Sequence, residues 1–350
     1  MRLRWVALVA GLLLFLWLIH RIGLGVIADN LRRVGWGFAA ILALEALVVL
    51  LTTLGWRRTM PPDRRVPLHS LLAMRIAGDG VNALAPAAVV GGELVRAGLL
   101  SRYVPSAEAV GSVGLAALAQ FLAQGLFVGI GASAVRAARL QPRLRVFGLA
   151  LLAFLALFLA ILAAVSRRRA VSPGRLGRVL VWASHLDRGG ARKSFRRDLG
   201  VQVFGALRER PGRLVLSVVF FLAGWAVGIV EVALALALLG YAVPAGTAFS
   251  IAVLAVLVEG ALFFVPARVG VQEGGVYAIF LALNLNPASG FSLGLVRRLR
   301  ELAWSLTGLV ILGFLRRRPP LEAKRRDTKG TSNGAPLTAR ESRGMNPESG

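Results

Sequence analysis

The chain consists largely of long apolar runs that are separated by short basic stretches. Each run approaches or exceeds the roughly 20 residues that a helix needs to cross the hydrocarbon layer of a bilayer. The runs occupy residues 5–19, 37–55, 108–132, 146–165, 214–239 and 294–314. A spanning segment of this kind is a helix, because the hydrocarbon offers no water to the backbone polar groups. The sequence therefore predicts an all-α fold, that of a polytopic helical membrane protein.

The charge of the chain raises the question of a nucleic-acid partner. Its 350 residues carry 42 Lys or Arg and 17 Asp or Glu, a net charge of +25. The arginines cluster between the apolar runs, as the positive-inside rule predicts for cytoplasmic loops, and no basic domain with interleaved aromatic residues is visible. We therefore expect an anionic membrane surface as the partner of these charges and no nucleic acid. The chain has no cysteine, which excludes disulfides and thiol chemistry.

The connections between the runs predict how the chain is organised. Residues 57–66 and 166–213 are basic loops, so we expect both of them and the N-terminus in the cytoplasm. Apolar residues recur at helical spacing within 21–36, which predicts an amphipathic helix at the membrane interface. One transmembrane domain, 1–315, precedes a polar tail, 316–350, that we expect to be disordered and cytoplasmic.

Two apolar segments, 68–103 and 247–285, are interrupted by proline and glycine. Their middles, PAAVVGGE from Pro86 and PARVGVQE from Pro266, share the pattern P-A-x-V-x-x-x-E about 180 residues apart. Broken helices at bilayer depth survive only where protein or a water-filled cavity satisfies the backbone, and paired breaks in two halves of a chain point to a transport site near the midplane. We therefore expect two re-entrant hairpins of opposite orientation, as in an inverted repeat. The four arginines of 136–145, which this topology places outside, oppose it.

Charged residues flank the first break. Glu93 and Arg96 are three residues apart and can pair on one helix face. They form either a structural salt bridge near a helix end or a charge pair in a cavity that holds a lipid head group, since ionisable residues inside a membrane default to function. Asp79 and Asn82 could cap a half-helix and satisfy freed backbone groups, and Arg75 could neutralise Asp79.

A second set of charges lies in the last apolar run. Arg297 and Glu301 have the spacing of an i, i+4 pair. The arginines there either snorkel to the interface or form a guanidinium cluster for phosphate or carboxylate.

Five further polar residues lie inside apolar segments: Glu45, Glu231, Glu259, Gln120 and Gln124. The glutamates are candidates for proton-linked carboxylates or for partners of an intramembrane arginine. The glutamines are expected to form hydrogen bonds between helices.

These patterns give one set of candidate substrate-binding residues. They are Asp79, Asn82, Pro86, Gly91, Gly92, Glu93 and Arg96 around the first break, Pro266, Arg268, Gly270, Gln272 and Glu273 around the second, and Arg297, Arg298, Arg300 and Glu301 in the last run.

Enzyme chemistry is poorly supported. The histidines His20, His69 and His185 are scattered, so no metal-ligand cluster is visible. No phosphate-cradling Walker motif is present, and no pairing of a nucleophile with histidine follows from the spacing. We expect no catalytic residue, no metal and no cofactor.

Several short stretches, taken in order, resemble the lysylphosphatidylglycerol synthase transmembrane-region family, also called flippase-like membrane proteins. They are VGW (34–36), GWR (55–57), GDGVNALAP (78–86), GGELVRAGLL (91–100), VPARVGVQEGG (265–275) and RRLREL (297–302). The resemblance covers about residues 1–315, and its second half is most similar to the hopanoid-biosynthesis-associated subgroup. Ala267 and Arg268 stand where relatives commonly have a glycine-rich turn.

The resemblance implies a bacterial inner-membrane protein that moves an amphipathic lipid between leaflets. In bifunctional relatives this region carries aminoacylated phosphatidylglycerol, and a separate cytosolic domain performs the aminoacyl transfer from charged tRNA. The chain ends about 35 residues after its last apolar run, so we do not expect that synthase activity here.

The leading hypothesis is therefore a translocase for a phospholipid or a polyisoprenoid or hopanoid-type lipid. Glu93, Arg96, Glu273 and Arg298 would face its head-group cavity. One alternative is a scaffold that recruits lipid-biosynthesis enzymes through the loop 166–213. Another is an intramembrane enzyme that modifies a lipid.

Overall fold

The computed structural model describes residues 13–14, 16–84, 91–137, 205, 210–261 and 270–317. Its helices are α2 (Leu24–Val34), α3 (Gly37–Thr59), α4 (Leu68–Leu84), α5 (Gly91–Leu100), α6 (Ser106–Ala137), α10 (Pro211–Leu238), α11 (Ala245–Ala261), α12 (Val271–Ala282) and α13 (Pro287–Arg317). These residues contain no β-strand, which confirms the predicted all-α fold.

Three of the described helices are long and apolar enough to cross a membrane. They are α3, α6 over Ser106–Gly131 and α10, and they contain the predicted runs 37–55, 108–132 and 214–239 almost completely. Large apolar side chains such as Phe121 and Val219 are exposed on them, as on a surface that faces lipid. The predicted run 146–165 lies outside the described residues.

Helix α13 covers the predicted run 294–314 but differs from these three in charge. Its 31 residues would extend about 46 Å at a rise of about 1.5 Å per residue, enough to cross a bilayer. It carries Arg297, Arg298, Arg300 and Glu301 in its first half. These charges need partners from neighbouring helices if the helix is to lie among apolar elements.

The helices form the same series twice along the chain. The series α3, α4, α5 and α6 has lengths of 23, 17, 10 and 32 residues, and α10, α11, α12 and α13 have 28, 17, 12 and 31. A shift of 180 residues superposes the first residue of α5 on that of α12, and the last residue of α6 on that of α13. The predicted breaks around Pro86 and Pro266 lie outside the described residues, between α4 and α5 and between α11 and α12.

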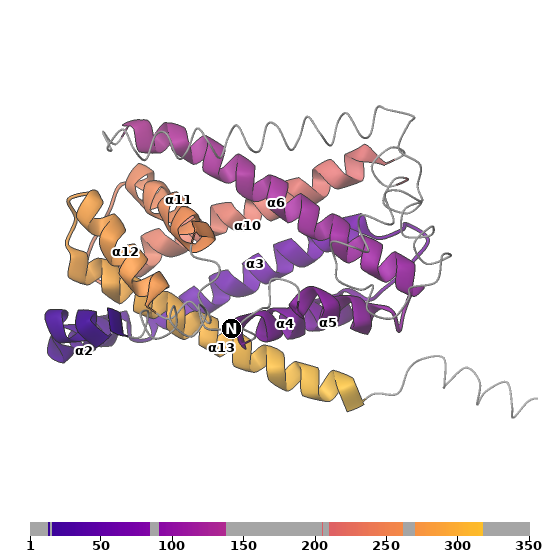
Figure 1. Ribbon diagram of the computed structural model, residues 1–350, viewed down its shortest axis with the longest axis horizontal. Helices are drawn as coiled ribbons and strands as arrows, with labels where there is room; N and C mark the ends of the chain where they lie inside the picture. The colour runs from indigo at the N-terminus through magenta and orange to yellow at the C-terminus, as the bar shows by residue number, and fades with distance from the viewer. Residues whose placement is uncertain are drawn as a thin grey trace, which may run out of the picture.

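The short helices α4 and α5 form one pair, and α11 and α12 form another; we call them the two short-helix pairs. They reach opposite ends of the molecule (Figure 1). At one end, Arg213 of α10 donates to the Arg58 carbonyl over 3.1 Å, and Arg64 binds Glu108 in the first turn of α6 at 2.9 Å. The connection from α5 to α6 lies at this end. At the other end, Asn286, between α12 and α13, donates to the Tyr241 hydroxyl over 3.3 Å, just beyond α10. This arrangement is the one expected of an inverted repeat, and the entry of the hairpins into a bilayer stays a prediction.

Close helix crossings rely on glycine. Where α4 crosses α13, a Cβ on Gly80 would lie 2.8 Å from the Ser305 carbonyl oxygen and 3.1 Å from the Gly308 Cα. Where α3 meets α10, Ser217 donates to the Gly55 carbonyl over 2.8 Å. Small residues at such contacts allow the backbones to approach, which is how helices associate in lipid.

The apolar stripe of α2 faces the protein. The sequence predicts an interfacial helix within 21–36, and the helix forms, but Ile27 packs with Leu18 and with Phe291 of α13. Asn30 also donates to the Ser292 hydroxyl over 2.8 Å. The amphipathic helix therefore forms as predicted with part of its apolar side on α13, and its location at the membrane interface stays a prediction.

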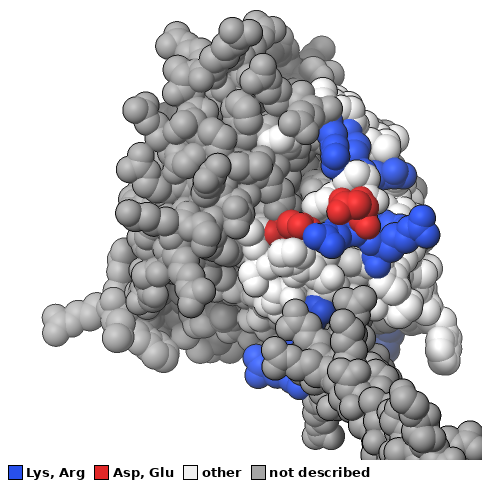
Figure 2. Space-filling view, turned by 90° about the vertical axis from the view of Figure 1, so that its right-hand side faces the viewer, with Lys and Arg blue, Asp and Glu red and all other residues white. Residues whose placement is uncertain are grey.

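The end of the molecule where α3 ends and α10 begins is rich in arginine. Arg57, Arg58 and Arg65 are exposed there. Figure 2 views this end and shows basic side chains gathered on the described part of the face, with acidic groups between them. The basic connection 57–66 lies at one end of the molecule. This agrees with the prediction that it is a loop outside the apolar layer.

Candidate functional site

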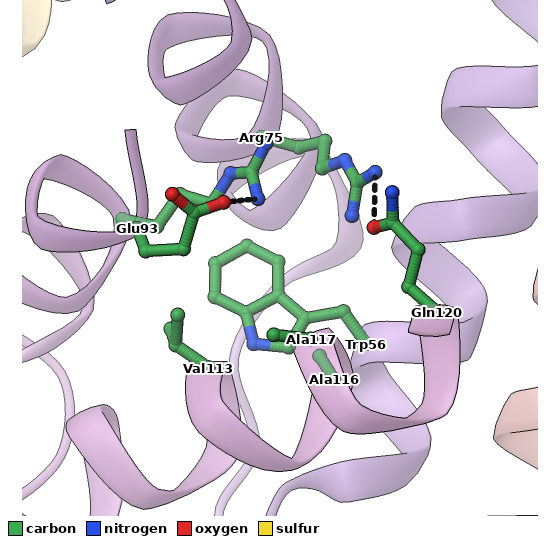
Figure 3. Close-up of a pocket in the computed structure, with 8 residues that line it drawn as sticks. Trp56, Arg75, Glu93, Val113, Ala116, Ala117 and Gln120 are labelled. Atoms are coloured by element: carbon green, nitrogen blue, oxygen red, sulfur yellow. Dashed lines mark hydrogen bonds and ion pairs between the residues drawn. The ribbon is translucent and has the colours of Figure 1, made fainter. Parts of the chain in front are cut away.

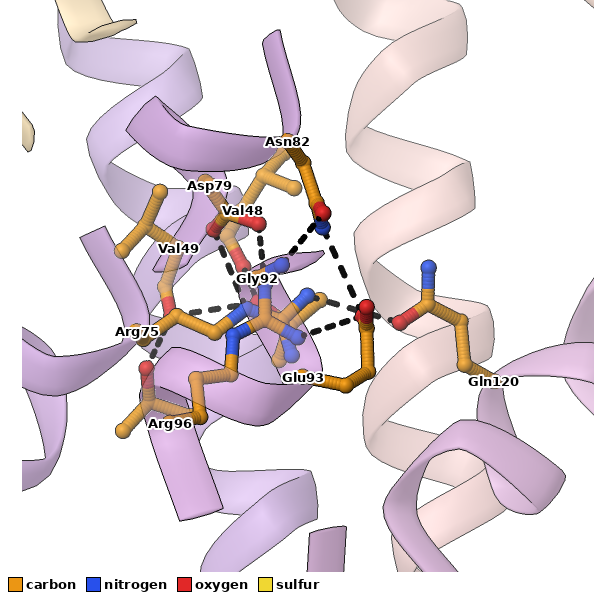
Figure 4. A network of polar contacts seen from close by, with 11 residues as sticks. Val48, Val49, Arg75, Asp79, Asn82, Gly92, Glu93, Arg96 and Gln120 are labelled. Atoms are coloured by element: carbon orange, nitrogen blue, oxygen red, sulfur yellow. Dashed lines mark hydrogen bonds and ion pairs between the residues drawn. The ribbon is translucent and has the colours of Figure 1, made fainter. Parts of the chain in front are cut away.

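A cluster of charged and amide side chains fills the space where α4 and α5 face each other (Figure 4). We call it the hairpin charge cluster and define it as Arg75, Asp79, Asn82, Glu93 and Arg96. Residues three and four apart on a helix share a face, so α4 presents Arg75, Asp79 and Asn82 together, and α5 presents Glu93 and Arg96.

The bonds within the cluster connect the two helices directly. Arg96 of α5 pairs with Asp79 of α4 through Nη2, and its Nη1 lies 3.2 Å from the Glu93 Oε1. The Arg75 Nε lies 3.3 Å from the Asp79 Oδ2. Asn82 accepts from the Gly92 backbone N–H over 2.7 Å and donates to Glu93 over 3.4 Å. Each arginine thus shares Asp79, and Asn82 satisfies a backbone donor in the first turn of α5.

Glycines bring α4 and α5 close enough for these bonds. A Cβ on Gly78 would lie 2.7 Å from the Arg96 side chain, and one on Gly92 would lie 2.6 Å from the Asn82 side chain. A larger residue at either position would separate the donors from their acceptors.

Burial makes the pairing energetically necessary. Arg75 and Arg96 are each only 7% exposed, whereas the Asp79 side chain is 44% exposed. Removing a guanidinium from water is costly unless carboxylates and hydrogen bonds replace the water. The cluster balances two guanidiniums with two carboxylates, and Asp79 is the most accessible of these four charged groups.

A cavity of about 20 Å³ adjoins the cluster (Figure 3). It is lined by Trp56 of α3, by Arg75, Glu93 and Arg96, and by α6 residues that include Gln120. Gln120 accepts from Arg75 over 3.5 Å, which is the hydrogen bond between helices that the sequence predicts for it. The volume is that of roughly one water molecule.

Several polar atoms on this cavity have no hydrogen-bond partner among the described residues. They are the Trp56 Nε1, the Glu93 Oε2 and the Arg96 Nε. Buried polar atoms normally find a partner, and an unsatisfied set around one cavity is the property of a site for water or a polar ligand.

A second charged region lies along α13. Arg298 pairs with Glu273 of α12 at 2.9 Å, and Arg297 pairs with Glu259 of α11 at 3.5 Å. Arg300 pairs with Glu45 of α3 at 2.9 Å and also with Glu231 of α10. We call these seven residues, together with Glu301, the α13 charge network. It connects α13 to four surrounding helices.

Glu273 also shapes the start of α12. Its Oε2 accepts from the Gly270 N–H over 3.1 Å while its Oε1 accepts from Arg298. Gly270 has a φ of +75°, in the left-handed region that glycine adopts without strain. A Cβ on Gly294 would lie 2.9 Å from the Glu273 backbone, so the crossing of α12 and α13 needs that glycine. Gln272 is buried, and its Oε1 has no hydrogen-bond partner in the described part of the chain.

The two charged regions are held together by one helix crossing. Gly80, next to Asp79, packs on Gly308 of α13, the helix that carries the arginines. A displacement of α13 along its axis would therefore move the α4 side of the hairpin charge cluster.

The structure sorts the predicted site residues into three groups. It brings Asp79, Asn82, Gly92, Glu93 and Arg96 together, and Gly91 begins the same helix. It separates Gly270, Gln272, Glu273, Arg297, Arg298, Arg300 and Glu301 from these residues and places them in or beside the α13 charge network. Pro86, Pro266 and Arg268 lie outside the described residues.

One expectation about the last run is corrected. Glu301 pairs with Arg298 at 3.4 Å, and the partner of Arg297 is Glu259 on another helix. The arginines of this run bind carboxylates of this chain, and their role as a site for a phosphate or carboxylate of a substrate stays a prediction. Glu45, Glu231 and Glu259 each pair with an arginine of α13, as one of their two interpretations predicts, and the other, that of proton-linked carboxylates, stays a prediction.

Six of the eight residues that line the cavity are absent from the predicted set, among them Arg75 and Trp56. Arg75 has the i, i+4 spacing to Asp79 that predicts their pair, so a signal for it existed. Trp56 has no such spacing signal, although it lies in the GWR stretch of the resemblance, and the packing of α3 against α4 and α6 brings its indole to the cavity.

Comparison with known proteins agrees with this architecture. No curated protein and no solved structure matches the chain. The family model described as "Lysylphosphatidylglycerol synthase TM region" matches residues 4–309, far more than half of the chain, and this range includes both short-helix pairs and most of α13. A membrane protein with these helices and this match is a member of a family linked to lipid handling: the chain belongs to the lysylphosphatidylglycerol synthase transmembrane-region family.

Proposed function

We propose that this protein moves an amphipathic lipid between the two leaflets of a membrane and leaves the lipid chemically unchanged. In this proposal the head group binds at the hairpin charge cluster, and the acyl or isoprenoid part remains in the bilayer. The family supports a role in lipid handling, and the geometry of the cluster supports a head-group site.

One observation carries the proposal. Two buried guanidiniums, Arg75 and Arg96, lie between half-length helices beside a cavity with three polar atoms that have no partner among the described residues. Ionisable residues in such a position mark substrate pathways in membrane proteins. The forked guanidinium suits the oxygens of a phosphate or carboxylate head group.

Binding would proceed by exchange of partners. The cavity of about 20 Å³ has no room for a head group, so an anionic oxygen has to replace one of the internal carboxylates. Asp79 is the carboxylate best placed to leave Arg96, because its side chain is 44% exposed and can be solvated. Glu93 would keep Arg96 in position while the exchange takes place, since it lies on the same helix face 3.2 Å away.

The orientation belongs to the same proposal. We place the chain in a bacterial inner membrane with the arginine-rich end of Figure 2 in the cytoplasm, because basic connections stay on that side. The lipids of that membrane are the proposed partners. The first short-helix pair would then open to the cytoplasm and the second to the outside.

Leaflet exposure of lipids in intact cells tests the proposal. A deletion strain is compared with strains restored by the wild type and by Glu93→Gln, using a membrane-impermeant reagent that labels amines or glycans, followed by mass spectrometry. We expect one lipid to be made normally but to stay unlabelled without the protein. Glu93→Gln should slow labelling about 10- to 100-fold, the equivalent of about 1.5–3 kcal/mol for a charge-assisted hydrogen bond.

The matched control is Glu108→Gln, which also removes a carboxylate from an arginine pair but lies at the exposed end of the molecule. It should leave labelling unchanged. Loss of membrane abundance in Glu93→Gln would favour a structural salt bridge. Equal exposure in all strains with accumulation of a precursor would contradict transport in favour of an enzyme or a scaffold.

A further inference from the structure

Two carboxylates in the α13 charge network share one guanidinium nitrogen. The Arg300 Nη1 lies 2.9 Å from the Glu45 Oε2 and also contacts the Glu231 Oε2. One positive charge therefore faces two acidic groups from α3 and α10. If both acids were ionised, the three residues would carry a net negative charge among apolar helices, where it is poorly solvated.

The second carboxylate oxygen of Glu231 has no hydrogen-bond partner among the residues that the structure describes. The Glu231 side chain is 4% exposed, and its Oε1 has no hydrogen bond to any described residue. A buried ionised carboxylate normally accepts several hydrogen bonds, whereas a protonated one has an oxygen that can donate. The Glu45 side chain is 22% exposed, so it is the member of the pair that water can reach.

The surrounding charged groups that the structure describes do not remove this excess of acid around Arg300. Arg297 of α13, Asp79 of α4, Glu259 of α11 and Glu301 of α13 act electrostatically on this group. Arg297 pairs with Glu259, and Glu301 pairs with Arg298. Glu108, near the start of α6, is also charged, but it pairs with Arg64 at the end of the molecule. The network as a whole has five carboxylates and three guanidiniums.

We propose that Glu45 and Glu231 bind one proton between them, and that this proton is carried with an anionic head group held at the hairpin charge cluster. The proposal rests on the proposed function and adds its source of energy. The proton enters from water at Glu45, converts one carboxylate of the pair to a carboxylic acid, and leaves as the acid ionises again. No other bond is made or broken.

Two structural features couple this pair to the hairpin charge cluster. Asp79, which binds Arg96, is near enough to Glu45 to act on it electrostatically. The helix that carries Arg300 also crosses α4 at Gly80 and Gly308, with no room between the backbones. A proton on the pair removes a negative charge from the neighbourhood of the head-group site, so proton and anion each favour the binding of the other.

Infrared spectroscopy of the purified full-length protein in lipid vesicles tests the proton site itself. We expect an absorption of protonated carboxyl groups at neutral pH that weakens as the pH rises. Glu231→Gln and Glu45→Gln should each abolish it, because a single remaining carboxylate is neutralised by Arg300. Glu108→Gln is the control and should retain it. Absence of the absorption from the wild type at neutral pH overturns the proposal, whether or not the variants fold.

Transport in a pH gradient tests the coupling. The protein is placed in phosphatidylcholine vesicles with a trace of phosphatidylglycerol labelled with a fluorophore on one acyl chain, and an impermeant reductant reports the label in the outer leaflet. If one proton accompanies one anionic lipid, a gradient of about one pH unit gives about a tenfold excess of label in the leaflet facing the less acidic side. The Glu231→Gln variant should still move the label between leaflets but leave it evenly distributed between them.

The outcomes separate the two proposals. An even distribution in the wild type despite rapid movement overturns proton coupling and leaves lipid movement standing. Failure of the wild type to move the label at all counts against the proposed function for an anionic phospholipid, while the infrared absorption still decides whether the pair binds a proton. Movement of label that follows the gradient in both the wild type and Glu231→Gln overturns the role of this pair.

Discussion

Arg300 and Arg64 form similar ion pairs in very different surroundings. Arg300 contacts Glu45 and Glu231, and the Glu231 side chain is nearly inaccessible. Arg64 holds Glu108 with two bonds of 2.9 and 3.0 Å at the exposed end of the molecule. An exposed pair contributes little because water competes for both charges, whereas breaking a buried pair strands a charge. The surroundings of an ion pair therefore decide its contribution to stability more than the geometry of the pair does.

Replacing Arg300 tests this difference. We expect Arg300→Ala to lower the free energy of unfolding by about 3–5 kcal/mol, because two carboxylates lose their only common guanidinium. Arg64→Ala, the matched control, should have a small effect. Thermal unfolding of both variants in detergent gives the comparison. Equal melting temperatures for the two variants would show that water already reaches Glu231.

Short helices and glycine crossings are the main features at the element scale. α4 and α5 are too short to cross a bilayer separately, with 17 and 10 residues, and α11 and α12 repeat this design with 17 and 12. Glycines such as Gly80 and Gly92 let them approach other helices closely, beside apolar contacts such as those of Leu100 and Phe280. Such contacts depend on close backbone approach, since lipid gives helices no hydrophobic reason to associate.

The contribution of a close backbone approach to stability can be measured at Gly308. A Cβ there would collide with the Ile76 carbonyl oxygen and would lie 3.0 Å from the Gly80 Cα. Gly308→Ala should destabilise the fold by about 1–3 kcal/mol, the usual cost of overpacking. Gly313→Ala on the same helix has open space around its Cβ and should be neutral or slightly stabilising. Melting temperatures that fall equally in both variants would exclude the crossing as the cause.

Among the helices that the structure describes, eight form two similar series of four whose short pairs lie at opposite ends of the molecule (Figure 1). In the proposed orientation, the connection after α5 faces the cytoplasm and the connection after α12 faces the outside. Two halves of opposite orientation around a central site give a transporter two equivalent ways of opening. The halves are not equivalent in charge, since α13 carries the arginines and α6 carries Gln120 at the corresponding depth.

Labelling of single cysteines tests the orientation. The chain has no cysteine of its own, so introduced thiols are labelled without background. Ser101 and Ala282 are exposed at the ends of α5 and α12. In intact inner-membrane preparations of known orientation, an impermeant maleimide should label Ser101→Cys only from the cytoplasmic side and Ala282→Cys only from the opposite side. Labelling of both from one side would contradict an inverted repeat.

The helices and ion pairs that depend on local spacing could be predicted from the sequence. Apolar runs predicted the helices α3, α6 and α10, and the i, i+3 spacing of Glu93 and Arg96 predicted a pair that the structure shows at 3.2 Å. Such features follow from the rise and period of one helix, which a reader of the sequence can count.

Contacts between residues that are distant along the chain depend on tertiary packing. Arg300 could have paired with any of several acids, and it contacts Glu45 and Glu231, which are 255 and 69 residues away along the chain. Trp56 reached the cavity, and the apolar stripe of α2 was turned towards Phe291, for the same reason. The order in which helices pack, and the glycines that let them touch, set these contacts, and no spacing within a single helix encodes them.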